Sequence, residues 1–147
     1  MKRFLKFLFR FLLLFIFAFV IFFFWGSSPN LDETEYAKLI ELENKVKPEN
    51  DSVFSIVTYN IGYLSGMTNN LPVAKPKELF DSNLVKVIAE TKKVNADIIA
   101  FQEIDYNAAR SYEVNQSKEI SKLGYNYIAD AVNWDETYVP FPYWPLS

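Results

Sequence analysis

The N-terminal apolar segment is the strongest constraint on how this chain folds, because its side chains favour lipid whereas the rest of the chain favours water. From Phe4 to Trp25 the chain runs for 22 residues that only Lys6 and Arg10 interrupt with a charge. A helix rises about 1.5 Å per residue, so this stretch is long enough to cross a hydrocarbon core about 30 Å thick. We therefore predict a membrane helix within residues 1–28.

The charges around this segment predict its orientation. Its basic residues all lie at the N-terminal end, at Lys2, Arg3, Lys6 and Arg10. Because the cytoplasmic flank of a membrane helix carries the excess of Lys and Arg, we expect a cytoplasmic N-terminus and an extracytoplasmic C-terminal part. The small residues at 26–28 also allow a cleavable signal peptide, although no Ala-x-Ala pattern occurs there. We favour an uncleaved, single-pass signal anchor.

The composition of the remaining chain excludes several classes of function. Without the four N-terminal bases, 11 Lys and Arg face 18 Asp and Glu, a net charge of −7. Nonspecific nucleic-acid binding depends on Lys and Arg that neutralise phosphates, so nucleic acid is not an expected partner. The chain has no cysteine, which excludes disulfides and thiolate chemistry, and it has no histidine.

Residues 29–52 are predicted to form a stalk or linker between the membrane helix and a folded domain. Within them, Asp32 to Val46 shows apolar residues on roughly one stripe at helical spacing, which predicts a short acidic helix. Pro48 to Ser52 is polar and predicts a hinge.

Residues 53–147 alternate between strand-like and helix-like patterns. The predicted strands are Val53–Tyr59, Asp97–Phe101 and Tyr125–Val132, and the predicted helices are Leu79–Val94 and Tyr112–Leu123, the second followed by Gly124. This order predicts an α/β layered fold. Three strands make a thin sheet compared with the usual five or six, so we expect the front part of a larger domain. The closing stretch, 134–146, is aromatic and contains three prolines.

Polar residues follow two of the predicted strands at the point where each strand ends. Asn60 follows the first strand, and Glu103 follows the second. In α/β sheets, sites gather at the carboxyl ends of strands, and amide and carboxylate oxygens are ligands that Mg²⁺ prefers. Two simpler interpretations stay open: Asn60 begins a turn toward Gly62, and Glu103 is a solvated carboxylate.

The predicted strand, helix and strand begin with the string VFSIVTYNIGYL, continue with the amphipathic helix and end with the string NADIIAFQEID. This arrangement resembles the opening of the endonuclease/exonuclease/phosphatase superfamily. The resemblance covers residues 53–147. It implies a two-sheet α/β sandwich, of which this chain holds an incomplete front part behind one transmembrane helix. It also implies that Glu103 binds Mg²⁺ or Mn²⁺ directly and that Asn60 orients a phosphate oxygen or a carboxylate partner. The implied reaction is hydrolysis of a phosphate ester by an activated water.

The chain departs from the family pattern beyond these two motifs. The resemblance implies a later Asp-x-Asn element and a C-terminal Ser-Asp-His element, and neither follows the third predicted strand. We therefore assign no catalytic residue within this chain and expect it to be inactive by itself. The missing elements have two interpretations: the chain comes from a truncated reading frame, or it is a degenerate relative of the family. Two ligands from one side seldom complete a Mg²⁺ site, which usually adds further carboxylates, waters and substrate phosphates.

Asp105 and Arg110 are further candidates, each with two interpretations. Asp105 lies two residues beyond Glu103, so it either supports the metal ligands or is a loop acid paired with Arg110. Arg110 either contacts a substrate phosphate or forms an ion pair at the surface.

The sequence therefore supports a membrane-anchored fragment of a divalent-metal-dependent phosphoesterase. The anchor and the acidic surface favour lipid or small-molecule phosphodiesters as substrates over genomic DNA. The alternative is a membrane-tethered, non-catalytic interaction module, or a truncated pseudogene product.

Overall fold

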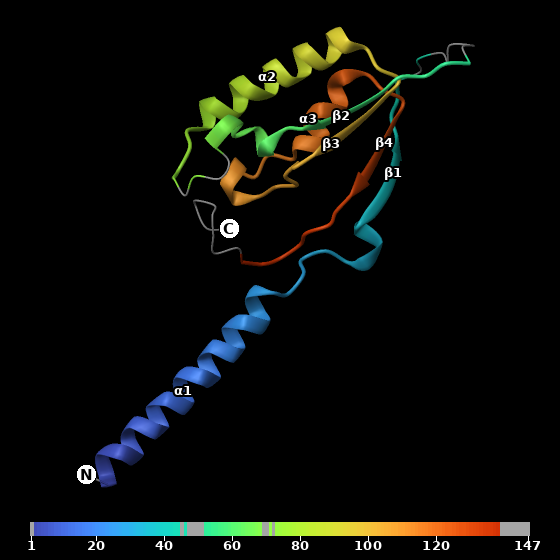
Figure 1. The fold of residues 1–147 in the computed structure, drawn as a ribbon. Coiled ribbons are helices and arrows are strands. Elements are labelled where there is room, and N and C mark those ends of the chain that lie inside the picture. The colour runs from blue at the N-terminus through green and yellow to red at the C-terminus, as the bar shows by residue number, and fades with distance from the viewer. Residues whose placement is uncertain (1, 45, 47–51, 69–70, 72, 139–147) are drawn as a thin grey trace.

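The computed structural model describes residues 2–44, 46, 52–68, 71 and 73–138 of the chain. Its helices are α1 (Lys2–Gly26), α2 (Lys77–Val94) and α3 (Gln116–Ile120), and its strands are β1 (Ala37–Glu41), β2 (Ile56–Asn60), β3 (Ile98–Gln102) and β4 (Tyr127–Ala131). Short 3₁₀ turns lie between them (Figure 1). The predicted mixed α/β architecture behind an apolar helix is confirmed. Most of the predicted hinge and the end of the aromatic closing stretch lie outside the described residues.

Helix α1 extends away from the rest of the structure, with the N-terminus at its far end (Figure 1). Its side chains are exposed along almost the whole length, and Gly26 is its one buried residue. The helix is long and apolar enough to cross a membrane, a test that a signal sequence also passes. A helix with apolar side chains exposed along its length is compatible with the predicted membrane segment.

The strands β2 and β3 form a parallel pair joined through α2. Their register runs from Ile56 opposite Ile98 to Asn60 opposite Gln102. Parallel neighbours need a crossover connection, and α2 supplies it along one side of the pair (Figure 1). The two strands and the helix that the sequence predicted here are confirmed to within a few residues.

Local sequence signals set both ends of α2. The helix begins after Pro76, and Lys92 and Lys93 lie in its last turn, where positive charge complements the helix dipole. Asn95 ends it in the left-handed conformation, with φ of 48°, and its N–H donates to the Thr91 carbonyl at 3.2 Å. Asparagine tolerates this conformation better than most residues, so the helix stops there.

The buried core lies around the loop that follows β2. Its members are Ile61, Leu64, Phe80, Val87 and Ile120, with Leu84, Phe101, Ile104 and Leu123 packed against them. Two of these residues, Ile61 and Leu64, belong to the loop itself. The loop at the carboxyl end of β2 is therefore fixed by packing against α2 and α3, rather than being a surface excursion.

The predicted acidic helix at residues 32–46 is wrong. Residues Glu33–Glu35 form one 3₁₀ turn, and the next residues form β1, which pairs antiparallel with β4 from Ala37 opposite Ala131 to Glu41 opposite Tyr127. A short helix needs an apolar face to bury, and Leu39 is 76% exposed. Pairing with β4 instead satisfies the backbone through hydrogen bonds that the local pattern cannot reveal.

The predicted helix at residues 112–123 is also partly wrong. Tyr112 and Glu113 have φ of 61° and 57°, which ends the preceding turn and excludes an α-helix there. Helix α3 starts only at Gln116, after the side chain of Asn115 accepts a hydrogen bond from the Lys118 N–H. The predicted role of Gly124 is confirmed, because it follows the last helical turn with φ of 103°.

Residues 135–138 hold the end of α1, and we call this set of contacts the clamp. The Tyr138 N–H donates to the Gly26 carbonyl at 3.0 Å, and the Thr137 N–H and hydroxyl both donate to the Ser28 carbonyl, at 3.1 and 2.8 Å. The chain that leaves α1 is therefore bound by the segment that follows β4.

Asp135 is the charged centre of the clamp. One of its carboxylate oxygens accepts the N–H groups of Asn30 and Leu31 at 2.8 and 2.7 Å and the Tyr36 hydroxyl at 3.1 Å. Desolvation by itself raises the pKa of Asp135, but these hydrogen bonds outweigh it and hold the pKa below its ordinary value of 3.8. The carboxylate thus ties three separate points of residues 30–36 together.

The clamp predicts a disulfide that the natural chain lacks. A Cβ placed on Gly26 would lie 3.5 Å from the Cβ of Tyr138, inside the range that disulfides span. We expect the double variant Gly26→Cys, Tyr138→Cys to form an intramolecular disulfide on mild oxidation, measured by maleimide labelling and intact mass. Because the natural chain has no cysteine, a Gly26→Cys, Lys122→Cys control reports the background. Full labelling of both thiols in the first pair would contradict the clamp.

The clamp also predicts a pH dependence. A carboxylate whose pKa is lowered in the folded state contributes stability above its unfolded pKa, and this stability is lost as the pH falls through the folded pKa. We expect the clamp to be intact at neutral pH and to release only below pH 3.8, the ordinary Asp value. The measurement is an NMR pH titration of the Thr137 and Tyr138 amides. Asp135→Asn should remove this acid transition and Glu136→Gln should keep it, whereas release near neutral pH would contradict the assignment.

Candidate functional site

The two predicted metal ligands lie at neighbouring strand ends. Asn60 is the last residue of β2 and stands opposite Gln102, the last residue of β3, and Glu103 follows directly. Because the strands are parallel, both carboxyl ends meet at one edge of the sheet. The structure thus brings together the two positions that the sequence singled out.

Backbone hydrogen bonds continue this pairing beyond the strands. The Ile61 N–H donates to the Gln102 carbonyl at 3.0 Å, and the Tyr63 N–H donates to the Glu103 carbonyl at 2.8 Å. The loop after β2 is therefore attached to the end of β3. Tyr63 and Glu103 meet through their main chains, which fixes the position of the Glu103 backbone.

Left-handed backbone conformations concentrate at this edge. Tyr63, Leu64 and Glu103 have φ of 54°, 63° and 53°. Each costs about 1–2 kcal/mol for a residue with a Cβ, so packing must compensate. Leu64, which is 2% exposed, supplies part of that compensation in the core. Such strain clusters at functional sites more often than elsewhere.

The side chain of Asn60 makes a turn within the loop. Its Oδ1 accepts the Gly62 N–H at 2.9 Å, and Gly62 has φ of 55°. The interpretation that Asn60 begins a turn is therefore confirmed. An amide oxygen has two lone pairs, and the Asn60 side chain is exposed, so this turn leaves acceptor capacity for a second partner.

Glu103 is half-buried at the opposite strand end. Its carboxylate and the Asn60 amide are oxygen donors of the kind that Mg²⁺ and Mn²⁺ take. Among the described residues, however, no group of three or more acidic, His or Cys side chains lies close enough to hold a metal ion. The donors fit the expected metal in kind, and they supply only part of a six-coordinate shell.

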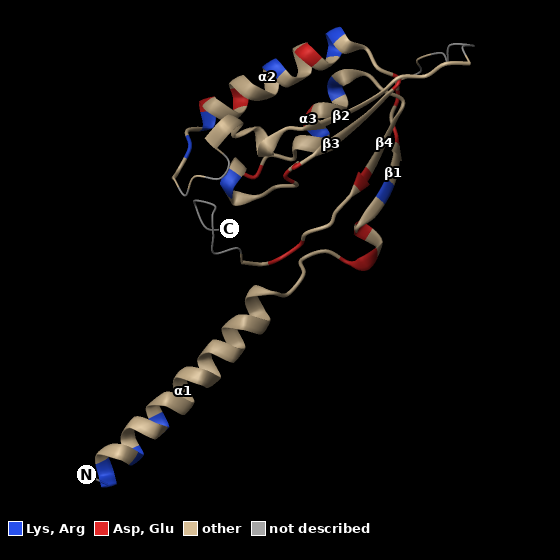
Figure 2. Cartoon of the chain, viewed as in Figure 1, with Lys and Arg blue, Asp and Glu red and all other residues tan. Residues whose placement is uncertain are grey.

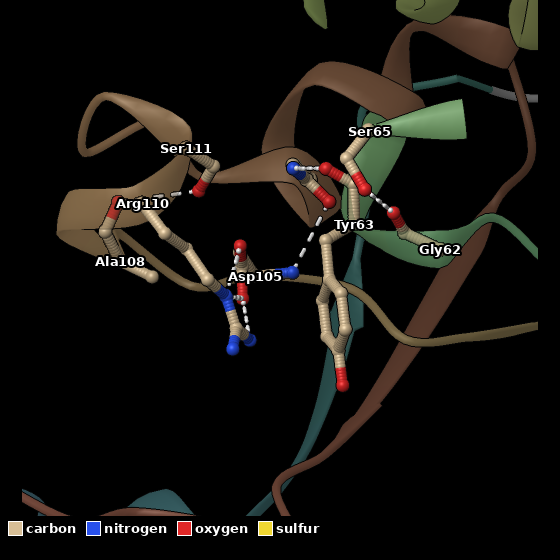
Figure 3. A network of polar contacts seen from close by, with 8 residues as sticks. Gly62, Tyr63, Ser65, Asp105, Ala108, Arg110 and Ser111 are labelled. Atoms are coloured by element: carbon tan, nitrogen blue, oxygen red, sulfur yellow. Dashed lines mark hydrogen bonds and ion pairs between the residues drawn. The ribbon is translucent and has the colours of Figure 1, made fainter. Parts of the chain in front are cut away.

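Asp105 and Arg110 form a nearly buried ion pair (Figure 3). The Arg110 Nε donates to both carboxylate oxygens at 3.1 and 3.0 Å, and Nη2 adds a third contact at 2.5 Å. The Asp105 and Arg110 side chains are 3% and 17% exposed. The interpretation of Asp105 as an acid paired with Arg110 is confirmed. Although Asp105 also begins an Asp-x-Asn triplet, its carboxylate is engaged by this guanidinium.

The ion pair supports the loop that carries Asn60. The Arg110 guanidinium carbon lies 3.9 Å from the centre of the Tyr63 ring, a cation–π contact. Arg110 therefore holds both the strand end after Glu103, through Asp105, and the loop after Asn60, through Tyr63. This arrangement makes Arg110 a positioning residue for the candidate site.

Gln116 joins the same network, and sequence reasoning missed it. It is 1% exposed, its Oε1 accepts the Asp105 N–H at 3.1 Å, and its Nε2 donates to the Tyr63 carbonyl at 2.9 Å. One amide thus bridges the two loops at the candidate site. No local signal marks it, because a buried glutamine next to Asn115 looks like an ordinary polar residue in the sequence.

A second polar cluster links β4 to the same region. Asp130 on β4 accepts the Ser117 hydroxyl at 2.6 Å and the Tyr106 hydroxyl at 3.3 Å. Desolvation and the Asp130 charge raise the pKa of Tyr106 to about 12, so this phenol stays a hydrogen-bond donor at neutral pH. The cluster connects the β1–β4 pair to the loop after β3.

A shallow apolar hollow lies elsewhere, between α2 and the β2–β3 pair. It is lined by Val57, Tyr59, Glu90, Thr91, Val94 and Ile99. It includes neither Asn60 nor Glu103, so it does not extend the candidate site.

Comparisons with known proteins add no assignment. No family model matches the chain, and no curated protein or solved structure matches it at a significant level. The candidate site therefore depends on its own geometry and on the two sequence motifs.

The Gln116 bridge predicts a specific loss of stability. Gln116→Leu should remove the two hydrogen bonds that the buried Gln116 amide makes to the Asp105 N–H and the Tyr63 carbonyl, which costs about 2–4 kcal/mol of the free energy of unfolding. Urea unfolding of the detergent-solubilised chain, followed by near-UV circular dichroism, measures the change. The control is Gln102→Leu, since Gln102 is exposed and should change the stability by less than about 0.5 kcal/mol. Equal losses in both variants would contradict the bridge.

Proposed function

We propose that this chain carries part of a divalent-metal site of a phosphoesterase similar to the endonuclease/exonuclease/phosphatase superfamily. Glu103 binds Mg²⁺ or Mn²⁺ directly, and Asn60 orients a phosphate oxygen or a carboxylate partner. The observation that carries the proposal is the parallel register, which sets Asn60 and Gln102 opposite each other and Glu103 next to them. Asn60 and Glu103 are 43 positions apart in the sequence, and the pairing of β2 with β3 makes them neighbours.

The chemistry assigned to this chain is binding and positioning. A bound divalent cation would neutralise charge on the phosphoryl oxygens and on the leaving group. Glu103 provides a carboxylate on a backbone held by Tyr63, and Arg110 and Gln116 keep that backbone in place. We expect no turnover by these 147 residues alone, because they include no histidine and the resemblance implies a histidine-bearing element.

The anchor is the second part of the proposal. α1 spans a membrane once, with the N-terminus in the cytoplasm and residues after Gly26 on the opposite side. The charge distribution supports this orientation: basic residues gather at the N-terminal end of α1, and acidic segments lie near its other end (Figure 2). The proposed substrate is a phosphate ester of a lipid or small molecule, since the net charge of −7 beyond the anchor disfavours nucleic acid.

A membrane-tethered, non-catalytic interaction module is the second candidate. Two observations favour it: the Asn60 side chain already accepts the Gly62 N–H, and no group of three or more metal-ligand side chains occurs in the part of the chain that is described. Selective metal binding at Glu103 separates the two candidates.

The proposal predicts selective broadening of NMR signals by Mn²⁺. In the untagged full chain, substoichiometric Mn²⁺ should broaden the amide signals of residues 60–64 and 103–104 first, and EDTA should restore them. Glu103→Gln should abolish this selective broadening because it removes the charged ligand.

Glu113→Gln is the matched control for this experiment. Glu113 is an exposed glutamate with φ of 57°, close to the 53° of Glu103, so the two share residue type and backbone conformation. We expect its substitution to leave the broadening at 60–64 unchanged. Broadening that spreads over all acidic residues, or that survives Glu103→Gln, would contradict the metal site and favour the interaction module.

A further inference from the structure

The clamp places an aromatic side chain from the far end of the fold against the apolar helix. The centre of the Tyr138 ring lies 5.3 Å from that of Phe22 in an edge-to-face arrangement, and 6.4 Å from that of Trp25. The backbone of Tyr138 meets Gly26, the one buried residue of α1. Tyr138 is therefore packed on the last turn of the helix.

The position of Phe22 sets the depth of this contact along α1. Phe22 precedes Gly26 by four residues, which corresponds to about 6 Å along a helix axis. The Tyr138 ring thus lies beside the last turn of the apolar stretch rather than beyond its end. Residues 27–30 are all polar or proline, so the apolar stretch stops within this turn.

Tyrosine and tryptophan have the chemistry of the membrane–water interface. Their rings are apolar and carry one polar group, so they collect at the level of the lipid headgroups. Trp25 is 53% exposed at this level, with Tyr138 beside it. The two rings come from opposite ends of the described chain, and together they make a wider interfacial surface than the helix alone provides.

We propose that residues 135–138 form a second membrane contact, in which the Tyr138 ring lies in the lipid headgroup region beside the last turn of α1. The occupant of this surface is phospholipid, because the surface is continuous with the exposed apolar side chains of the helix. The proposal rests on the membrane anchor proposed above and extends it from one helix to the segment after β4.

Asp135 links this second membrane contact to the folded chain. Its carboxylate binds Asn30, Leu31 and Tyr36, so it holds residues 135–138 against the chain that leaves α1. Without Asp135, the hydrogen bonds of Thr137 and Tyr138 and the ring contacts of Tyr138 remain, and we expect these to be too few to keep the ring at the helix. We therefore expect the segment after β4 to stay attached to the chain that leaves α1, which keeps the end of β4 at the membrane surface.

The test is depth-dependent quenching of single tryptophans by brominated phosphatidylcholine, with the full chain in phosphatidylcholine vesicles. The anchor reporter keeps Trp25 and carries Trp134→Phe and Trp144→Phe. The clamp reporter carries Tyr138→Trp with all three natural tryptophans changed to Phe. A remote reporter carries Tyr127→Trp in the same background, since Tyr127 is exposed at the start of β4.

We expect lipids brominated near the headgroup to quench the anchor and clamp reporters to a similar extent and to leave the remote reporter unquenched. Adding Asp135→Ala to the clamp reporter should reduce its quenching to the remote level, whereas the adjacent Glu136→Ala should not. Quenching of the anchor reporter without quenching of the clamp reporter overturns this inference alone. An unquenched anchor reporter overturns the membrane anchor and this inference with it.

Discussion

The parallel pairing of β2 with β3 positions both the buried core and the candidate site. It is closed at its start by Ser55, whose N–H and hydroxyl donate to the Asp97 carboxylate at 2.7 Å each. These hydrogen bonds lower the pKa of Asp97. At the other end, the loop after Asn60 continues the pairing to Glu103. α2 covers one side of the pair, and the core forms between this helix and the loop after β2. The register of the pair sets the candidate site, because it places Asn60 opposite Gln102.

The polar network at the carboxyl end of the pair compensates for a small core. A left-handed loop with a nearly buried ion pair is costly unless every polar group is satisfied. Gln116 and Arg110 supply these partners, and in the described residues no buried side-chain nitrogen or oxygen lacks one. The strained backbone around Glu103 is thereby held by side chains from two later turns. The backbone at the proposed metal site is therefore held in place before any metal binds.

The β1–β4 pair connects the fold to α1 through both of its strands. β1 follows the helix by about ten residues and pairs with β4, and the clamp then returns the chain to Gly26. The segment between α1 and the domain is therefore held by contacts over residues 30–41, through Asp135 and through pairing with β4. Asp130 joins β4 to Ser117 and Tyr106, so the β1–β4 pair is also connected to the loop after β3.

Local periodicity and the rule for parallel strand ends were enough to predict the apolar helix, β2, α2, β3, β4 and the adjacency of Asn60 and Glu103 from the sequence. The sequence offered the Asp105–Arg110 pair as one of two interpretations. Four features could be found only in the folded chain: β1, the late start of α3, the Gln116 bridge and the clamp. The start of α3 depends on the local backbone turn at Tyr112 and Glu113. The other three depend on hydrogen bonds between residues far apart in the chain, as between Gly26 and Tyr138. Such bonds leave no periodic pattern in either partner, so local propensity cannot predict them.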